Sequence, residues 1–206
     1  MKIIDAIKKE GKPFIIPESS RNDLPLFFKE MGYKIGAEIG THRGEFTEKF
    51  CKEGLEIYAI DPWIGFPGQG RTQQVQYTQD GYYEDAKKKL IPFENCHIVR
   101  KKSMDAIEDF KDGSLDFVYI DGDHNFKHTA EDIYEWSKKV RRGGIVSGHD
   151  YFNTSPASSN VVCHVKAIVD AYVNMFEINN FYLYGGTEGA RHGDPDKYYS
   201  WLFIKD

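Results

Sequence analysis

Short apolar runs alternate with longer amphipathic stretches along most of the chain. Such alternation is typical of repeated strand–helix units, in which each apolar strand is buried between two layers of helices. The pattern therefore predicts a doubly wound, Rossmann-like α/β fold with a mostly parallel, seven-stranded sheet. The predicted strands are 34–39, 56–60, 97–100, 115–120, 145–148, 180–184 and 199–204.

Amphipathic stretches predict the helices between those strands. A Gly-rich connection joins the last two predicted strands, both of which are rich in aromatic residues. Strands joined in this way favour an antiparallel hairpin at the C-terminal edge of the sheet, and this aromatic hairpin is a candidate for pairing across a homodimer. The predicted helices are 45–52, 82–90, 104–110, 127–140 and 162–175.

The first 33 residues lie outside the regular alternation. A helix is expected over the opening residues, and a second is expected from the cap residues Asn22 or Asp23 to a stop at Gly32. We therefore predict a single domain over 1–206, with a helical extension over 1–33 and a Rossmann-like core over 34–206. The chain of 206 residues is 40% hydrophobic, which is enough for one well-filled core.

Charge and composition exclude several classes of protein. The net charge of -5 disfavours a general nucleic-acid binder, because phosphate backbones are bound mainly through positive charge. No apolar run approaches the roughly 20 residues of a membrane span, and the charged start is unlike a secretory signal, so we predict a cytoplasmic protein. The three cysteines are scattered, which predicts neither a disulfide framework nor a zinc site.

A glycine-containing turn follows the first predicted core strand. The strand ends near Glu38, and the chain then turns through Gly40 and Gly44 directly into an amphipathic helix. Glycine permits a close approach of a ligand, and a helix N-terminus directs free N–H groups at a carboxylate or phosphate. The alternative interpretation is a tight strand–helix turn without a ligand.

The ends of the next two strands carry further candidate ligand contacts. Asp61 lies about 20 residues beyond the glycine turn, where an acidic side chain can accept hydrogen bonds from ribose hydroxyls. Trp63 is placed either to lie against an adenine ring or to form an ordinary hydrophobic lid. Ser103, after the third strand, is either a ligand contact or a helix cap.

Acidic and histidine side chains follow the fourth and fifth strands. The fourth strand runs into Asp121, Asp123 and His124, and the fifth runs into His149 and Asp150. Ligands of open α/β sheets bind outside the carboxyl ends of the strands, so these side chains are expected to meet above the sheet. A helix cap is the alternative role for Asp123, and a core position is the alternative for His149.

These motifs resemble those of class I S-adenosylmethionine-dependent methyltransferases. The resemblance covers roughly 34–150 and is strongest to the small-molecule enzymes with a Glu-Ile-Gly first motif and an Asp-Gly-x-His motif, here Glu38 to Gly40 and Asp121 to His124. The family's commoner form has a glycine in place of His42, so a less open loop is expected here. The resemblance implies which part of the cofactor each residue contacts. The methionine part is lined by Glu38, Gly40, Thr41, His42 and Gly44, and the ribose is held by Asp61. The adenine is flanked by Trp63, Ser103 and Met104, and the methyl end lies near Asp121.

The reaction implied by this resemblance is methylation of a hydroxyl on a small molecule or a sugar. Methyl transfer requires a positioned and deprotonated nucleophile, and we predict Asp121 and His124 as the catalytic residues. The motifs also look like those of metal-dependent catechol and sugar O-methyltransferases, which implies Mg²⁺ or another divalent metal at Asp121 and Asp150, with His149 as a further candidate ligand. Because His149 and Tyr151 flank Asp150, the family's acidic pair is incomplete here.

Two other functions compete with this interpretation. An NAD(P)-dependent oxidoreductase would need a GxGxxG turn for its pyrophosphate, whereas Gly40 and Gly44 lie four residues apart with His42 between them. A non-catalytic nucleoside-binding module would keep the acidic strand ends without the chemistry. Polar loops at 62–77, 152–160 and 185–193 are expected to close over the substrate without identifying it.

Overall fold

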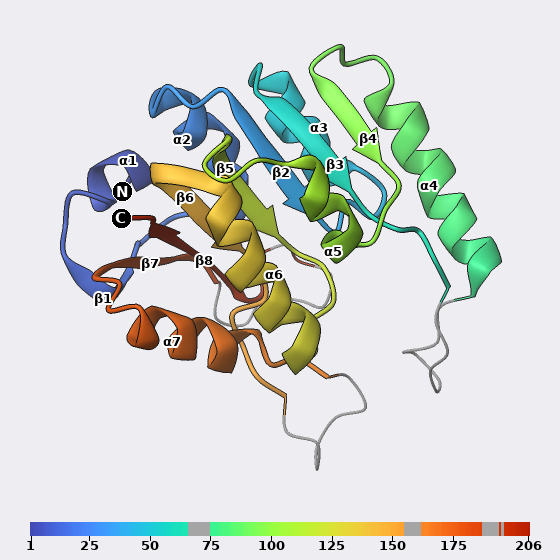
Figure 1. Ribbon diagram of the computed structural model, residues 1–206. Helices are drawn as coiled ribbons and strands as arrows, with labels where there is room; N and C mark the ends of the chain where they lie inside the picture. Colours follow the sequence, from blue (N-terminus) through green and yellow to red (C-terminus); the bar gives the residue numbers. More distant parts are fainter. Residues whose placement is uncertain (66–74, 155–161, 187–193, 195) are drawn as a thin grey trace.

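The computed structural model describes residues 1–65, 75–154, 162–186, 194 and 196–206. Its centre is one eight-stranded sheet with the strand order β1-β7-β8-β6-β5-β2-β3-β4 (Figure 1). All seven predicted strands are present, and the prediction of a mostly parallel Rossmann-like fold is confirmed. The strands are β1 (Gly11–Ile15), β2 (Ile35–Ile39), β3 (Glu56–Ile60), β4 (Cys96–Val99), β5 (Leu115–Ile120), β6 (Val140–Gly148), β7 (Asn180–Gly185) and β8 (Tyr199–Ile204).

The eighth strand, β1, lies within the helical extension predicted for 1–33, between its two predicted helices. It pairs in parallel with β7 at one edge of the sheet. Pro13 lacks an N–H donor, which is tolerated on an edge strand because one side of that strand needs no partner. The helical part of the prediction is confirmed by α1 (Ile3–Ala6) and α2 (Leu24–Glu30), with the short 3-10 turn η1 (Arg21–Asp23) before α2.

The predicted antiparallel C-terminal pair is confirmed, but it is not the outermost element of the sheet. Strand β8 pairs antiparallel with both β6 and β7, and β7 pairs on its other side with β1. Both strands therefore use their backbone hydrogen bonds within the chain. Backbone pairing of this aromatic hairpin across a homodimer is thus ruled out, and the edge strands of the described sheet are β1 and β4.

Helices cover both faces of the sheet, as the doubly wound fold requires (Figure 1). The buried clusters place α1 to α4 on one face and α5 to α7 on the other. Helix α4 begins earlier than predicted, at Gln76 instead of Tyr82, so the preceding loop is shorter than expected. The remaining helices are α3 (Glu45–Lys52), α4 (Gln76–Leu90), α5 (Ser103–Ala106), η3 (Ile107–Asp109), α6 (Phe126–Lys139) and α7 (Val165–Met175).

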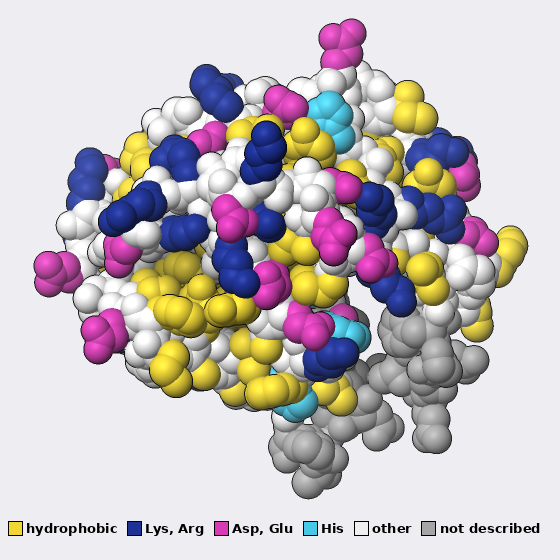
Figure 2. Space-filling model, viewed as in Figure 1, with side chains coloured by type: hydrophobic (Ala, Val, Ile, Leu, Met, Phe, Trp, Pro, Cys, Tyr) yellow, Lys and Arg dark blue, Asp and Glu magenta, His cyan; other side chains and the backbone are white. Residues whose placement is uncertain are grey.

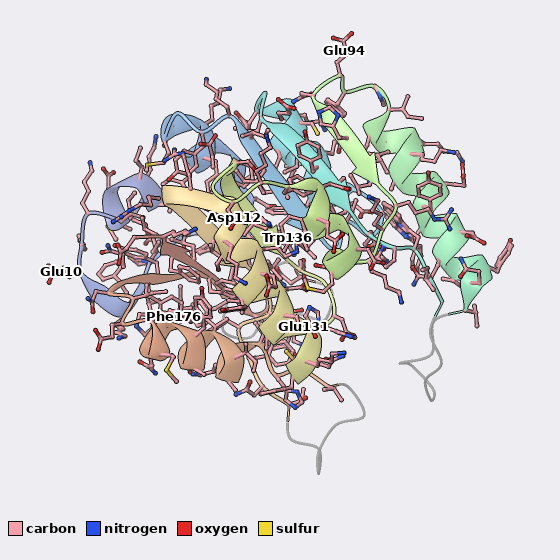
Figure 3. All side chains as sticks on the ribbon, in the orientation of Figure 1. Glu10, Glu94, Asp112, Glu131, Trp136 and Phe176 are labelled. Atoms are coloured by element: carbon pink, nitrogen blue, oxygen red, sulfur yellow. The ribbon has the colours of Figure 1, made fainter. Side chains whose placement is uncertain are left out.

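Alternate side chains of β5 fill the two cores. Phe117 points toward α2 and α3, where its ring stacks 4.2 Å from that of Phe28, while Val118 belongs to the opposite cluster. On that opposite face, Trp136 of α6 is fully buried between the helix and the sheet (Figure 3). Burial of such large apolar side chains contributes on the order of 2–3 kcal/mol each, and it fixes the strand ends on which the site depends.

The surface carries mixed charge. Figure 2 shows lysine and arginine side chains interspersed with aspartate and glutamate over the face with α6 and α7. Tyr134 of α6, Met175 of α7 and Phe176 directly after α7 have exposed apolar side chains. No described helix has both the length and the apolar content needed to cross a membrane.

Candidate active site

The predicted site residues meet at one rim of the sheet. Strand β2 pairs with both β3 and β5, and the last paired residue, Ile39, lies opposite Ile60 and Ile120. The residues that follow these three positions, Gly40, Asp61 and Asp121, consequently leave the sheet side by side. This is the arrangement that the strand-end pattern predicted.

A cleft of about 220 Å³ opens at this rim, between the turn after β2 and the end of β5. It contains most of the residues assigned to the methionine part of the cofactor, together with side chains from the N-terminal segment. Its lining residues are Arg21, Asn22, Glu38, Gly40, Thr41, His42, Glu45, Phe46, Lys49 and Asp121.

Gly40 is required by packing as well as by its backbone conformation. Its φ is +93°, and a Cβ at this position would lie 2.1 Å from the backbone oxygen of Asp121. Only glycine lets the two strand ends approach this closely. Gly44, with φ +75°, is the N-cap of α3, and so the turn enters the helix through a left-handed residue.

Asp61 joins the two loops at the centre of the rim. Its Oδ2 accepts a hydrogen bond from the backbone N–H of His42 at 2.9 Å, and its Oδ1 accepts one from Trp63 N–H at 2.8 Å. Burial raises the pKa of Asp61, and these two hydrogen bonds offset that effect only in part. Each carboxylate oxygen has a second acceptor position, so ribose hydroxyls have acceptors here.

His42 has φ +52°, a left-handed conformation that glycine adopts at less cost. This conformation explains why a glycine suits the position in the commoner form of the motif. The imidazole packs edge-on against the Tyr82 ring at 4.3 Å between centroids. Burial lowers the pKa of His42. The loop was expected to be less open because of His42. In the structure, the His42 side chain packs against Tyr82 of α4.

Trp63 does not present its ring to an adenine, which corrects one prediction. The residue is fully buried, its Nε1 donates a hydrogen bond to the backbone oxygen of His42 at 2.7 Å, and its ring packs against Tyr83. The indole therefore fixes the glycine turn from behind.

Ser103 lies at the predicted strand end, but its hydroxyl is used within the protein. It donates to the buried carboxylate of Asp132 and accepts a hydrogen bond from Trp136 Nε1 at 2.7 Å. Burial raises the pKa of Asp132 to about 6. Met104 is partly buried against the core of α5 to α7. Any contact of these two residues with an adenine would thus come from the Ser103 backbone and the exposed part of Met104.

Glu38 is the most buried acid of the cleft, at 2% exposure. The Thr47 hydroxyl of α3 donates a hydrogen bond to its carboxylate. Burial raises the pKa of Glu38 to about 8, an effect that the Thr47 hydrogen bond offsets only in part. A bound cation would favour the ionised carboxylate, so Glu38 is suited to an ammonium group.

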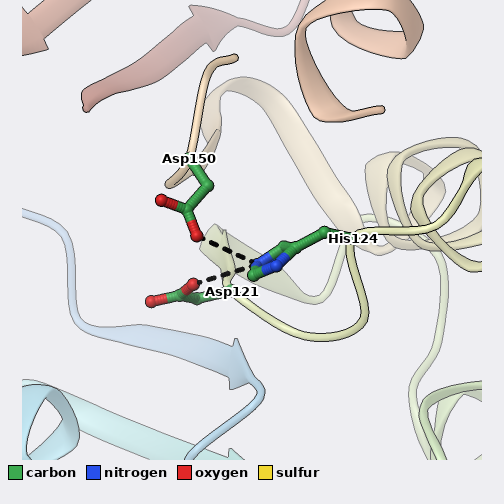
Figure 4. A group of neighbouring side chains, drawn as sticks. All are labelled: Asp121, His124 and Asp150. Atoms are coloured by element: carbon green, nitrogen blue, oxygen red, sulfur yellow. Dashed lines mark ion pairs between the residues drawn. The ribbon is translucent and has the colours of Figure 1, made fainter. Parts of the chain in front are cut away.

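Asp121, His124 and Asp150 form a compact group beside the cleft (Figure 4). His124 Nε2 lies 3.6 Å from Asp121 Oδ1 and 3.3 Å from Asp150 Oδ2. Burial lowers the pKa of His124, but the two carboxylates outweigh it and raise the pKa overall. Burial raises the pKa of Asp121, yet His124 and the Arg21 guanidinium hold it well below its usual range.

His149 occupies a different place from the one predicted for a metal ligand. Its Nδ1 pairs with Asp150 Oδ1 at 3.0 Å, on the carboxylate oxygen that does not face His124. The three-residue group with ligand-like spacing contains His124 in its place. His149 therefore supports Asp150. Exposed Asp123 pairs with His128 near the start of α6, but it does not cap that helix, because the N-cap is Asn125.

Arg21 was not anticipated as a site residue. Its Nη2 donates to Asp121 Oδ2 at 3.1 Å, and its guanidinium lies over the Phe46 ring, 4.4 Å from the centroid. Nothing in the sequence marked it, because it lies 100 positions from Asp121 in a segment interpreted as accessory.

Comparison with known proteins identifies the family. Residues 37–151, more than half of the chain, match a family described as "Methyltransferase domain". The chain belongs to the class I methyltransferases. In this methyltransferase the matched region runs from β2 to Tyr151, and so it includes the glycine turn, Asp61 and the Asp121–His124–Asp150 group.

Solved structures share the fold of this methyltransferase at low sequence identity. The O-methyltransferase of Bacillus cereus in complex with SAH is 15% identical, with a TM-score of 0.62 over 89% of this chain and 80% of that chain. The N-methyltransferase NodS of Bradyrhizobium japonicum is 14% identical, with a TM-score of 0.57 over 90% and 94%. An rRNA methylase of Streptococcus thermophilus is 15% identical, with a TM-score of 0.59 over 88% and 93%.

An uncharacterized protein of Sinorhizobium fredii is 26% identical over 119 residues, which are 55% of this chain but 12% of that protein. The chain thus corresponds to a small part of this curated relative. The names of the solved neighbours differ in acceptor, and so the shared fold does not select the attacked atom.

Proposed function

We propose that the protein is an S-adenosylmethionine-dependent methyltransferase that methylates a hydroxyl group of a small molecule or a sugar. The observation that carries the proposal is a cleft lined by Glu38 and Asp121, with Asp61 bonded to the lining residue His42 and His124 next to Asp121. The cofactor supplies a methyl group on a positively charged sulfur. The resemblance of the Asp121 and Asp150 positions to those of catechol and sugar O-methyltransferases supports the oxygen acceptor.

His124 is the residue placed to take the acceptor's proton. Asp121 and Asp150 raise the pKa of its imidazole, which makes it a stronger base and stabilises the imidazolium formed when the proton arrives. The backbone N–H of His164 donates to the His124 carbonyl oxygen at 2.9 Å, which fixes the loop that carries the base. The protein's share of the reaction is then positioning of the hydroxyl and acceptance of one proton.

A divalent metal is an alternative way to activate the hydroxyl, in which His124 acts as a ligand and not as the base. Asp121, His124 and Asp150 each offer one ligand atom, and these atoms lie within 4.8 Å of one another. Oxygen and imidazole donors suit a divalent ion, which would lower the pKa of a bound hydroxyl. The rate of methyl transfer is measured before and after dialysis against a chelator. An unchanged rate that added Mg²⁺ or Mn²⁺ does not raise would show that no metal is needed.

Calorimetric titration followed by label transfer tests the function. We expect S-adenosylhomocysteine to bind and NAD not to bind, and we expect Asp61→Ala to remove binding because the ribose loses its acceptor. Asp85→Ala is the matched control, since Asp85 is exposed and pairs with Arg43 outside the cleft. Incubation of cell extract with methyl-labelled S-adenosylmethionine should then yield a small labelled product. NAD binding without S-adenosylhomocysteine binding would favour an oxidoreductase, and cofactor binding without any transfer would favour a non-catalytic nucleoside-binding module.

A further inference from the structure

Two buried polar groups that line the same cleft have no hydrogen-bond partner among the described residues. They are the Nε of Arg21 and the hydroxyl of Thr41. Thr41 is 3% exposed, and the Arg21 side chain is 13% exposed. A buried donor without an acceptor is costly, so two such groups in residues that line one cleft indicate that a ligand with acceptor atoms completes the site.

Arg21 is held rigidly with part of its guanidinium unused. Its Nη2 is occupied by Asp121, and Phe46 fixes the plane of the group at 4.4 Å. A guanidinium offers five donors in a planar fork, so the free Nε edge can still bind an oxyanion. Stacking on a ring restricts rotation of that fork, which favours recognition of a carboxylate over recognition of a single oxygen.

Charge is distributed asymmetrically around the cleft. Arg21 and Lys49 are the cations in the lining, and they lie close enough for Arg21 to lower the pKa of Lys49 in addition to the effect of burial. The buried acid Glu38 also lines the cleft. The other two lining acids have cationic partners: Asp121 pairs with Arg21, and Glu45, which is more than half exposed, pairs with Lys89 at 3.4 Å. A ligand that carries both an ammonium and a carboxylate fits this distribution.

We infer that Arg21 binds the carboxylate at the amino-acid end of the cofactor, while Glu38 receives the ammonium. The inference rests on the proposed function, because it assigns a role within the same cleft. It also makes the N-terminal segment, which lies outside the matched family region, part of the cofactor site. Because Arg21 holds Asp121 at the same time, the bound carboxylate is linked to the reaction centre through one guanidinium.

Asp196 is the positioning residue for Arg21. Its Oδ1 accepts the backbone N–H of Arg21 at 2.8 Å, and its Oδ2 accepts the Ser20 hydroxyl at 2.6 Å. Asp196 comes from the connection between β7 and β8, so it ties the C-terminal part of the chain to the cleft. It acts on the ligand only through the placement of Arg21.

Two ligands separate the carboxylate contact from the rest of the cofactor. Calorimetric titration of the full chain with S-adenosylhomocysteine and with its decarboxylated analogue is compared across variants. Arg21→Ala should weaken S-adenosylhomocysteine binding by about ten- to a hundredfold, the effect of a charge-assisted hydrogen bond, and leave the analogue nearly unchanged. Arg21→Lys keeps a cation near Asp121 but lacks the planar fork of donors. It should weaken S-adenosylhomocysteine binding less than Arg21→Ala does, and it should also leave binding of the analogue nearly unchanged. Asp196→Asn should also weaken S-adenosylhomocysteine binding selectively, by about threefold to tenfold.

Arg141→Ala is the matched control, because it removes an Arg–Asp pair, with Asp116, outside the cleft. It should leave both affinities unchanged. Equal weakening of both ligands by Arg21→Ala and Arg21→Lys, or no weakening of either, would overturn the assignment of the carboxylate while leaving the proposed function intact. Failure of the wild-type chain to bind either ligand would overturn the proposed function and this inference together.

Discussion

The cofactor half and the reaction half of the rim hold their acidic groups in different ways. On the cofactor half, Asp61 accepts two backbone N–H groups, and Glu38 is buried against the Thr47 hydroxyl. On the reaction half, Asp121 and Asp150 are placed around His124 by charge, at distances of 3.3–3.6 Å. The first half is fixed by neutral donors, and the second by charged neighbours, with Arg21 also paired to Asp121.

This difference explains the opposite directions of the pKa shifts. Neutral donors offset burial only in part, so the pKa of Glu38 rises to about 8. Charged neighbours outweigh burial at Asp121, whose pKa falls. A site that must receive a positively charged cofactor can keep one acid protonated until binding, whereas a base needs permanent counter-ions to stabilise its imidazolium.

The largest expected effect comes from replacing the base on the reaction half. His124→Gln should lower the rate of methyl transfer by about 10²–10⁴-fold, the usual contribution of a general base, with little change in S-adenosylhomocysteine affinity. Label transfer and calorimetry measure the two quantities. His128→Gln is the control, since His128 is exposed and paired with Asp123. Equal losses in the two variants would mean that His124 only shapes the loop.

A second substitution tests the close approach of the two halves. Gly40→Ala places a Cβ 2.1 Å from the Asp121 backbone oxygen at a positive φ, and we expect a loss of about 3 kcal/mol in the free energy of unfolding. Gly54→Ala is matched, because Gly54 has φ +81° and no atom within 4 Å of an added Cβ, so it should cost about 1 kcal/mol. Denaturant unfolding gives both values. Similar losses would place the two strand ends farther apart than we describe.

The smallest effect concerns pH. Because the folded pKa of Glu38 is raised, its contribution to stability is present below its unfolded pKa near 4.3 and is lost as the pH rises through about 8. Glu38→Gln should therefore gain stability relative to wild type across that range. Asp121 has the opposite sign, since its folded pKa is depressed. Asp121→Asn should be least stable relative to wild type near neutral pH, and the deficit should shrink as the pH falls below about 4.

Thermal unfolding of both variants and the wild type at a series of pH values measures these trends. If the stability difference from wild type changed with pH in the same direction for both variants, the contrast between the two halves would be contradicted. The measurement is made without ligands, because a bound cation would favour ionised Glu38 and change its slope.

Most of the fold was predictable because each buried strand carries an apolar run followed by a turn signal. Strand β1 was not, since its residues are largely exposed and include Pro13. Such an edge strand is stabilised by one neighbour, β7, which lies far along the chain. Local pattern therefore contains little information about it.

The site was predictable where residue type and strand end coincide, as at Glu38, Asp61 and Asp121. The role of a site residue was not predictable where its side chain can bond either to a ligand or to other residues of the protein. Ser103 binds Asp132 and Trp136 of α6, and Trp63 is buried behind the loop that it was expected to flank. The polar loops expected to close over the substrate include 66–74, 155–160 and 187–193, which lie outside the described residues.

The meeting of both chain ends at Ser20 and Asp196 limits how the protein can be shortened. A fragment cut to the matched region, 37–151, would keep the glycine turn and the base but would lose Arg21, β7 and β8. It would also remove β8 from its pairing with β6 and remove the Phe28 ring that stacks on Phe117. Shortened or fused forms of the protein should therefore retain everything from the first helix to the last strand, because the smallest working unit is larger than the region matched by the family.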